Sequence, residues 1–240
     1  MKEIDFMLNK KVRLLIQRMG NNRVGFTLAE VLVTLGIIGV VSAMTVPTLM
    51  QNYQRKSYVT QLHKVYNEFQ QAALQYMTDR NALNLKEAGL VTNEAADSWV
   101  KNYFKVVQDC SAEPAACFAI GEYKRLNGND ISIFTTGVNQ YVLASGAAVY
   151  VSPDGDGKVN VWFDINGKKG PNIVGRDVFA TKLYNNGMMD DSVCANNISS
   201  APLTKEQREE SYQADCLEGN GGCWWGCLGK IINDGWEMNY

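Results

Sequence analysis

Histidine is almost absent from this sequence, since its 240 residues contain only one, His63. A hydrolytic triad that depends on histidine would have to be built around that residue. It stands beside the apolar stripe of a predicted long helix, so we interpret it as a helix-surface residue. The sequence also lacks a glycine-rich phosphate loop, an H-E-x-x-H motif and any carboxylate pair whose spacing singles it out. These absences give no indication of an enzyme.

Charge is almost absent from one stretch of the chain. Between Phe26 and Met50 the only charged residue is Glu30. As a helix these residues would span roughly 37 Å at about 1.5 Å per residue, enough to cross a bilayer core of about 30 Å. Length and composition therefore predict a membrane segment, in which a carboxylate is costly unless a partner compensates its charge.

The charges that do occur are distributed unevenly. Residues 1–25 hold six basic and two acidic residues, a net charge of +4, against -2 for the whole chain and therefore -6 for the remainder. Basic residues just before an apolar span favour a cytoplasmic N-terminus, which places everything after Met50 outside the cytoplasm. The acidic remainder has no basic footprint for phosphate, so we expect no nucleic acid partner.

Two simpler interpretations of the N-terminus stay open. One is a secretory signal peptide, for which the Val-Ser-Ala sequence at residues 41–43 offers the small residues that signal peptidase prefers. The long polar leader and Glu30 do not suit such a signal. The other is an ordinary single-span anchor, which would not need Gly25, Phe26 and Glu30 together.

The chain resembles a known family at this point. The junction Gly25-Phe26, with Glu30 as the fifth residue counted from Phe26, the apolar run and Pro47 resemble the processing and methylation signature of type IV pilins and type II secretion pseudopilins. The resemblance implies that a prepilin peptidase cleaves between Gly25 and Phe26 on the cytoplasmic side and that the new Phe26 amine is N-methylated. It covers about the first fifth of the chain.

The same resemblance implies where the protein works and with what. We expect a single-pass protein of the bacterial inner membrane with a cytoplasmic N-terminus and an extracytoplasmic C-terminal domain, found in a filament after assembly. Its expected partners are other pilin or pseudopilin subunits, the prepilin peptidase and methyltransferase, the inner-membrane assembly platform and the membrane itself.

A single long helix is predicted from about Phe26 to Arg80, bent at Pro47, where a backbone hydrogen bond is lost. Residues 26–50 would form the membrane or filament-core half, and residues 51–80 an amphipathic half. The apolar face of the second half recurs at spacings of three and four residues. It consists of Tyr58, Leu62, Val65, Tyr66, Phe69, Ala72, Ala73, Tyr76 and Met77.

Residues 81–240 are predicted to form a globular extracytoplasmic domain of α+β class. A connector over 81–93 leads to a short helix over 94–107, with Trp99, Val100, Tyr103, Phe104 and Val107 facing inward. Strand patterns occur at 131–134, 140–144, 147–152, 158–165 and 177–184. The second and third of these are separated by Ser145-Gly146, which predicts a two-residue hairpin turn. An antiparallel meander whose apolar face covers the amphipathic half of the long helix would result.

All six cysteines lie in the part predicted to be extracytoplasmic, which favours disulfides that stabilise a loop-rich C-terminal region. The pairing of Cys110 with Cys117 is the local candidate, and the sequence leaves the other pairings open. A zinc site is the alternative, although the spacings fit no pair of C-x2-C knuckles. The four remaining cysteines are Cys194, Cys216, Cys223 and Cys227.

One element could hold a metal ion, and otherwise no cofactor is expected. Asp154-Gly-Asp156-Gly offers hard oxygen ligands of the kind calcium prefers, and calcium occurs in ectodomain loops of some pseudopilins. The element lacks the third acidic ligand and the terminal glutamate of an EF-hand. The alternative is a tight turn between strands. Residues 163–179 also resemble a stretch that recurs in ectodomains of pilin-like proteins.

Three functions fit these patterns. The first is a structural subunit that polymerises through its N-terminal helix into a type IV pilus or a type II secretion pseudopilus. The second is a minor subunit that caps or primes a filament or takes up DNA. The third is a membrane-tethered adhesin or binding module, with Trp224 and Trp225 as its exposed contacts. Substitution of Glu30 distinguishes them, since an anchored module should keep its function and a filament subunit should not.

Overall fold

The computed structural model describes residues 25–135, 137–194, 198–219 and 222–240. The chain divides into two compact units, Met1–Gln51 and Asn52–Tyr240. The described part of the first unit is a helix and its lead-in, and the second, the globular unit, holds a sheet and further helices. Of the predicted leader, only Gly25 is among the described residues.

One helix, α2 (Leu28–Asp79), contributes residues to both units. Its 52 residues confirm the single helix predicted from about Phe26 to Arg80. Pro47 lies inside it. The bend at Pro47 stays a prediction.

The second half of α2 buries one face in the globular unit. Leu62 and Phe69 are fully enclosed, and the half-buried Tyr58 and Tyr66 pack against the same core. The predicted apolar face is therefore confirmed, and Val59 extends it. The buried residues of the helix are Val59, Leu62, Val65, Phe69, Ala72, Ala73, Tyr76 and Met77.

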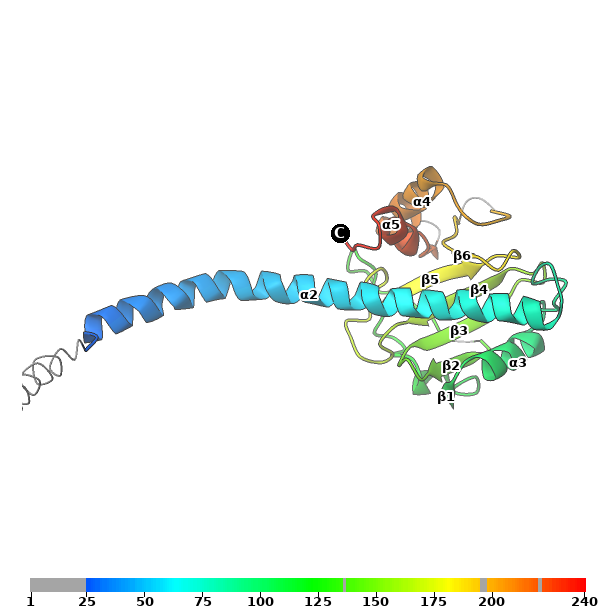
Figure 1. The fold of residues 1–240 in the computed structure, drawn as a ribbon, viewed down its shortest axis with the longest axis horizontal. Helices are drawn as coiled ribbons and strands as arrows, with labels where there is room; N and C mark the ends of the chain where they lie inside the picture. The colour runs from blue at the N-terminus through cyan, green and yellow to red at the C-terminus, as the bar shows by residue number, and fades with distance from the viewer. Residues whose placement is uncertain (1–24, 136, 195–197, 220–221) are drawn as a thin grey trace, which may run out of the picture. The chain divides into compact units, whose positions relative to one another are not determined.

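An antiparallel sheet supplies the other side of this core. Figure 1 shows the second half of α2 lying across one face of the sheet. The six strands of the described chain pair in the order in which they occur, so the sheet is the predicted meander with one further strand at each edge. They are β1 (Val106–Asp109), β2 (Gln140–Leu143), β3 (Ala148–Pro153), β4 (Val159–Asp164), β5 (Val178–Leu183) and β6 (Met189–Asp190).

Alternation along β4 places its apolar side chains in the core. Val159, Val161 and Phe163 are fully buried, while Asn160 and Trp162 between them are half-buried. This matches the period of two that the sequence shows. Asp164 departs from the pattern because it is also fully buried.

The turn between β2 and β3 is longer than the two residues predicted. The Leu143 backbone N–H donates to the Ala147 carbonyl at 2.9 Å, which leaves residues 144–146 between the strands. Gly146 has a φ of 91°, a left-handed conformation that glycine adopts without steric cost. A three-residue loop with glycine in this position is the next commonest hairpin after the two-residue form.

The helix predicted over 94–107 is shorter in the structure. The observed α3 (Asn93–Tyr103) begins after Thr92, whose hydroxyl accepts from the Ala95 backbone N–H at 3.2 Å. Phe104 is already extended, and the chain continues as β1. Val107 was predicted to face inward but is 68% exposed, because a register shift between Val106 and Gln108 turns it away from the core.

The strand predicted at 131–134 is not part of the sheet. The Ile131 backbone N–H donates to the Tyr123 carbonyl at 3.0 Å. The two residues flank a loop that an isolated β-bridge between Lys124 and Asp130 closes. Phe134 takes a φ of 60° and stacks on Phe118 at 4.0 Å. These two apolar side chains fill the core from a loop, so the apolar pattern was correct and the strand assignment was wrong.

Short helices complete the globular unit. A 3-10 turn, η1 (Pro114–Ala116), lies in the first disulfide loop. Near the C-terminus α4 (Lys205–Ser211) runs into η2 (Tyr212–Leu217), a stretch of π-helix, and α5 (Cys227–Asn233) follows. The capping box of α4 joins Thr204 and Gln207, each side chain accepting from the other residue's backbone N–H.

The burial of α2 gives a first prediction. We expect Leu62→Ala to lower the free energy of unfolding by about 2–5 kcal/mol, because it deletes a fully buried side chain and leaves a cavity. Leu74→Ala is a matched control on the same helix, since Leu74 is 63% exposed and its loss should change stability by only about 0.5 kcal/mol. Denaturant unfolding of the full-length protein in detergent measures both, and equal effects would contradict the packing of α2.

Candidate assembly segment and other functional sites

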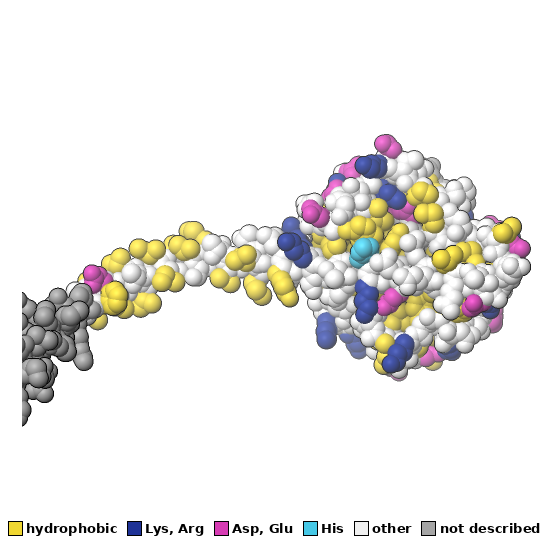
Figure 2. Space-filling model, in the orientation of Figure 1, with side chains coloured by type: hydrophobic (Ala, Val, Ile, Leu, Met, Phe, Trp, Pro, Cys, Tyr) yellow, Lys and Arg dark blue, Asp and Glu magenta, His cyan; other side chains and the backbone are white. Residues whose placement is uncertain are grey.

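The first half of α2 has an apolar surface that nothing in its own unit covers. Its large apolar side chains are 42–79% exposed between Leu28 and Met50, and Figure 2 shows them around this part of the helix. The helix is long and apolar enough to cross a membrane, judged by length and composition. An exposed apolar surface of this extent is a feature of membrane or subunit contacts. Lipid or other helices must therefore cover this segment.

Glu30 is engaged at the start of the helix. Its Oε2 accepts from the Thr27 backbone N–H at 2.8 Å and from the Thr27 hydroxyl at 2.9 Å. The Thr27 hydroxyl oxygen in turn accepts from the Glu30 backbone N–H at 3.2 Å. This is the reciprocal arrangement of a capping box, which the T-x-x-E spacing in the sequence could have predicted. Glu30 thus caps its own helix and occupies the end where a helix dipole favours negative charge.

The junction predicted for cleavage lies just outside the helix. Gly25 and Phe26 precede Leu28 in non-helical conformation, and Phe26 is 86% exposed. A side chain at Gly25 would meet open space, so no described neighbour encloses the peptide bond between them.

A known family model matches the segment that contains the junction and Glu30. The family model described as the prokaryotic N-terminal methylation motif matches residues 21–46. The chain carries the methylation motif that is the hallmark of type IV pilins and pseudopilins. The match spans Gly25, Phe26 and Glu30, so the resemblance inferred from these residues is confirmed, and the motif indicates a pilin-like structural subunit. Searches of curated proteins and of solved structures each gave no match.

Three disulfides hold the globular unit of this pilin-like chain. Cys110 pairs with Cys117, as the sequence favoured, and the pairings left open are Cys194 with Cys223 and Cys216 with Cys227. The four C-terminal sulfurs considered for zinc are therefore joined in pairs. The Asp215 carboxylate lies beside the Cys194–Cys223 pair and accepts from the Cys194 backbone N–H at 3.0 Å.

The calcium candidate has the geometry of a tight turn. Asp154 Oδ1 accepts from the backbone N–H groups of Asp156 and Lys158, at 3.0 and 3.2 Å. Lysine ammonium groups also contact the two carboxylates: Lys158 lies 3.7 Å from Asp154, and Lys86 lies 3.3 Å from Asp156. These contacts support the turn alternative, and calcium binding here stays a prediction.

Two buried carboxylates organise residues 163–179, whose resemblance to pilin-like ectodomains stays a prediction. Asp164 Oδ2 accepts from the Tyr123 hydroxyl at 3.0 Å. The Asp177 carboxylate accepts from the backbone N–H groups of Asn172 and Ile173 at 2.8 and 2.7 Å. Burial and the nearby Asp177 charge raise the pKa of Asp164 to about 8, and burial also raises the pKa of Asp177.

A second pair of buried carboxylates joins the sheet edge to the C-terminal helices. Asp190 accepts from Arg208 in a two-point contact at 2.9 and 2.6 Å. Asp191 is fully buried and accepts from the backbone N–H groups of Gly226 and Gly229 at 2.7 and 2.6 Å. Gly226 has a φ of 88°, and a Cβ there would lie 2.3 Å from the Ser211 carbonyl oxygen, so only glycine fits.

Two sequence interpretations of side chains in the globular unit have different outcomes. His63 is exposed on α2 and stacks on Trp236 with ring centroids 4.0 Å apart, which confirms a helix-surface residue. Trp224 was predicted to be an exposed contact of a binding module, but it is 6% exposed and packs on Trp162 at 5.1 Å. Trp225 is half-buried.

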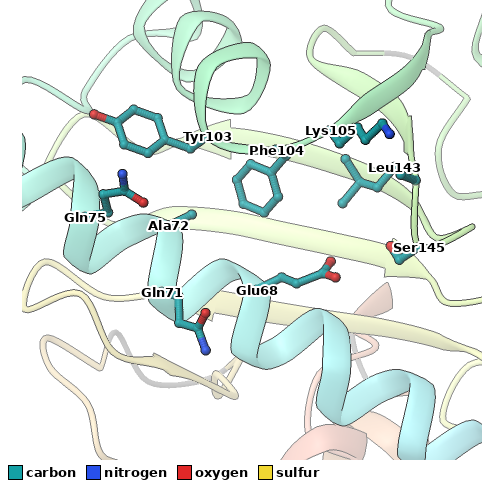
Figure 3. Close-up of a pocket in the computed structure, with 10 residues that line it drawn as sticks. Glu68, Gln71, Ala72, Gln75, Tyr103, Phe104, Lys105, Leu143 and Ser145 are labelled. Atoms are coloured by element: carbon teal, nitrogen blue, oxygen red, sulfur yellow. The ribbon is translucent and has the colours of Figure 1, made fainter.

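A cleft of about 260 Å³ opens between α2, the end of α3 and the β2–β3 turn (Figure 3). Phe104 and Leu143 form its apolar side, and the carboxylate of Glu68 reaches toward it from α2. Glu68 also lies 3.9 Å from Lys64 on the same helix. The hydroxyl of Ser145 is buried at the edge of the cleft. That hydroxyl makes no hydrogen bond within the described chain, so the Glu68 carboxylate does not activate it.

The raised pKa of Asp164 predicts a pH dependence of stability. Its folded pKa, about 8, lies above the unfolded value, so the folded state binds the proton more tightly and stability falls as pH rises from about 4 to 8. One such group contributes up to about 1.4 kcal/mol per pH unit. We expect Asp164→Asn, which stays neutral, to flatten this slope.

Unfolding measured at several pH values checks this expectation. Asp130→Asn is the control, because the Asp130 side chain is 82% exposed and pairs only at the surface with Lys124. This control should keep the wild-type slope. Parallel slopes for the wild type and Asp164→Asn would show that Asp164 is already ionised in the folded protein across this range.

Proposed function

We propose that this chain is a structural subunit that is cleaved between Gly25 and Phe26, N-methylated on Phe26 and polymerised through the apolar half of α2. The product is a type IV pilus or a type II secretion pseudopilus. The observation that carries the proposal is the methylation motif on a helix whose apolar side chains are uncovered. In lipid the bilayer covers them, and after extraction only other such helices can do so.

The same proposal names partners and a location. A prepilin peptidase and methyltransferase acts on the junction, an inner-membrane assembly platform receives the processed subunit, and like subunits surround it in the filament. The subunit waits in the bacterial inner membrane with its N-terminus in the cytoplasm. The globular unit lies outside the cytoplasm, which its three disulfides support.

Glu30 supplies the register of assembly in this proposal. Cleavage creates a positive amine on Phe26, and a neighbouring Glu30 can pair with it when helices stack. A buried charge pair of this kind is strengthened by the low dielectric and is costly to break from one side. Within the subunit, the Thr27 groups that now contact Glu30 leave its Oε1 free of any hydrogen bond in the described chain.

Processing gives the first test of the proposal. We expect the mature protein from membranes to lack residues 1–25 and to carry a methyl group on Phe26, as seen by intact mass and N-terminal sequencing. Gly25→Leu should block cleavage, because a branched side chain replaces the bare backbone at the junction. An N-terminus after Ala43, or an intact Met1 in the presence of the peptidase, would contradict it.

Substitution of Glu30 tests the assembly mechanism. We expect Glu30→Ala to be inserted and cleaved at close to wild-type levels while filaments are lost or greatly reduced. Glu30→Gln keeps a side chain that can complete the capping box but removes the charge. It should therefore be intermediate or equally defective.

Thr27→Ala is the matched control for the cap, since it removes the hydroxyl and keeps the Glu30 charge. It should assemble better than either Glu30 variant. Filament yield by shearing and immunoblotting, with each variant as the sole copy, separates the two roles. Wild-type assembly of cleaved Glu30→Ala would rule out the charge pair.

A further inference from the structure

A groove in the globular unit lies where α2 meets the C-terminal segment. Its walls come from α2 between Asn52 and Thr60 and from residues 236–239, and its volume is about 460 Å³. Val59 and Met238, both buried, form its apolar floor. Its volume is in the range of small-ligand sites.

One wall of the groove is fixed by an aromatic stack. Trp236 stacks on His63 at 4.0 Å and meets the edge of Tyr66 at 5.0 Å. Its backbone N–H donates to the Ile231 carbonyl at 2.8 Å. Trp236 has a φ of 65°, an unfavourable conformation for a bulky residue that persists only where surrounding contacts hold it. The groove is thus a built feature of the fold.

The charge lining the groove is positive. Arg55 and Lys56 both line it, and neither makes an ion pair within the described part of the chain. Glu237 is the one carboxylate among the lining residues, and it accepts from the Asn239 amide at 3.5 Å. Two unpaired cations beside one carboxylate, with the amide of Asn52 nearby, favour an anionic occupant.

The position of these cations along the chain indicates which anion. The apolar run ends at Met50, and Arg55 and Lys56 follow within about 9 Å along a helix. That distance corresponds to the headgroup layer of a bilayer, where tryptophan is also enriched.

We propose that this groove holds the phosphate headgroup of an anionic phospholipid while the subunit waits in the membrane. The inference rests on the proposed function, because it takes the apolar half of α2 to be in the bilayer. Arg55 and Lys56 contact the phosphate, and Trp236, Val59 and Met238 supply the apolar lining of the groove for the first carbons of the lipid. Release of this lipid then accompanies entry into the filament.

Lipid retention on the full-length protein tests the proposal. The protein is reconstituted in nanodiscs that contain phosphatidylcholine and phosphatidylglycerol. Native mass spectrometry then counts the lipids that stay bound to the protein after it is released from the nanodisc. We expect the wild type to retain phosphatidylglycerol preferentially. Arg55→Ala with Lys56→Ala should reduce this retention by roughly tenfold or more, since each surface cation contributes about fivefold to anionic lipid binding.

The control removes the same amount of charge elsewhere in the globular unit. Lys64→Ala with Lys86→Ala replaces two side chains, 61% and 59% exposed, that do not line the groove. It should retain phosphatidylglycerol as the wild type does. Equal losses in both double variants, or equal retention of the two lipids by the wild type, would overturn the proposal.

Two further measurements identify the source of the anion and separate this inference from the proposed function. Excess inorganic phosphate should not displace the bound lipid, and displacement would show a free-anion site instead. Filament yield and resistance to alkaline extraction are scored on the same variants. Failure of the wild type to assemble would contradict the proposed function, whereas the lipid preference in nanodiscs is measured independently of assembly.

Discussion

The uncovered apolar surface of the first half of α2 is the constraint on which the rest of this protein depends. Side chains such as Leu32, Ile37 and Leu49 are more than half exposed, and nothing in their own unit packs on them. Burial of apolar surface contributes about 25 cal/mol per Å², so leaving a helix of this length in water is strongly unfavourable. This segment needs an apolar environment, and a bilayer or a bundle of like helices would each provide one.

The globular unit shows the opposite solution to the same problem. Beyond residue 59, α2 has one apolar face, and the sheet covers that face with the inward side chains of its strands. Buried carboxylates then organise the loops. Asp177 holds the turn before β5 through backbone N–H groups, and Asp191 does the same for the start of α5. Each loop is fixed by local hydrogen bonds to a carboxylate.

Much of this architecture was predictable because it depends on local patterns. The spacing of Leu62, Val65 and Phe69 and the absence of breakers after Pro47 predicted the long helix, and alternation predicted β4. The T-x-x-E sequence at Thr27 also held enough information for the capping box. The methylation motif around Gly25 and Phe26 was recognisable because it is contiguous in the sequence.

Features that depend on distant contacts were not predictable. Ile131 has the pattern of a strand, but its backbone partner is Tyr123, which the sequence does not indicate. Trp224 is buried because Trp162, on a strand far away in sequence, lies against it. The groove beside Arg55 depends on Trp236, which is distant in sequence and stacks on His63 of α2.

The connectivity of the two C-terminal disulfides has a consequence for biogenesis. The bridge from Cys194 to Cys223 and the bridge from Cys216 to Cys227 interleave in the sequence. Cys216 lies between the two cysteines of the first bridge, and Cys223 lies between the two cysteines of the second. If these cysteines oxidise in the order in which they leave the membrane, Cys194 meets Cys216 first and forms a non-native bridge. The native pairs therefore require either that Cys227 has been exported before oxidation begins or that a thiol attacks and exchanges the early bridge. If the proposed function holds, production of the native subunit would need one of these two routes in addition to cleavage by the peptidase.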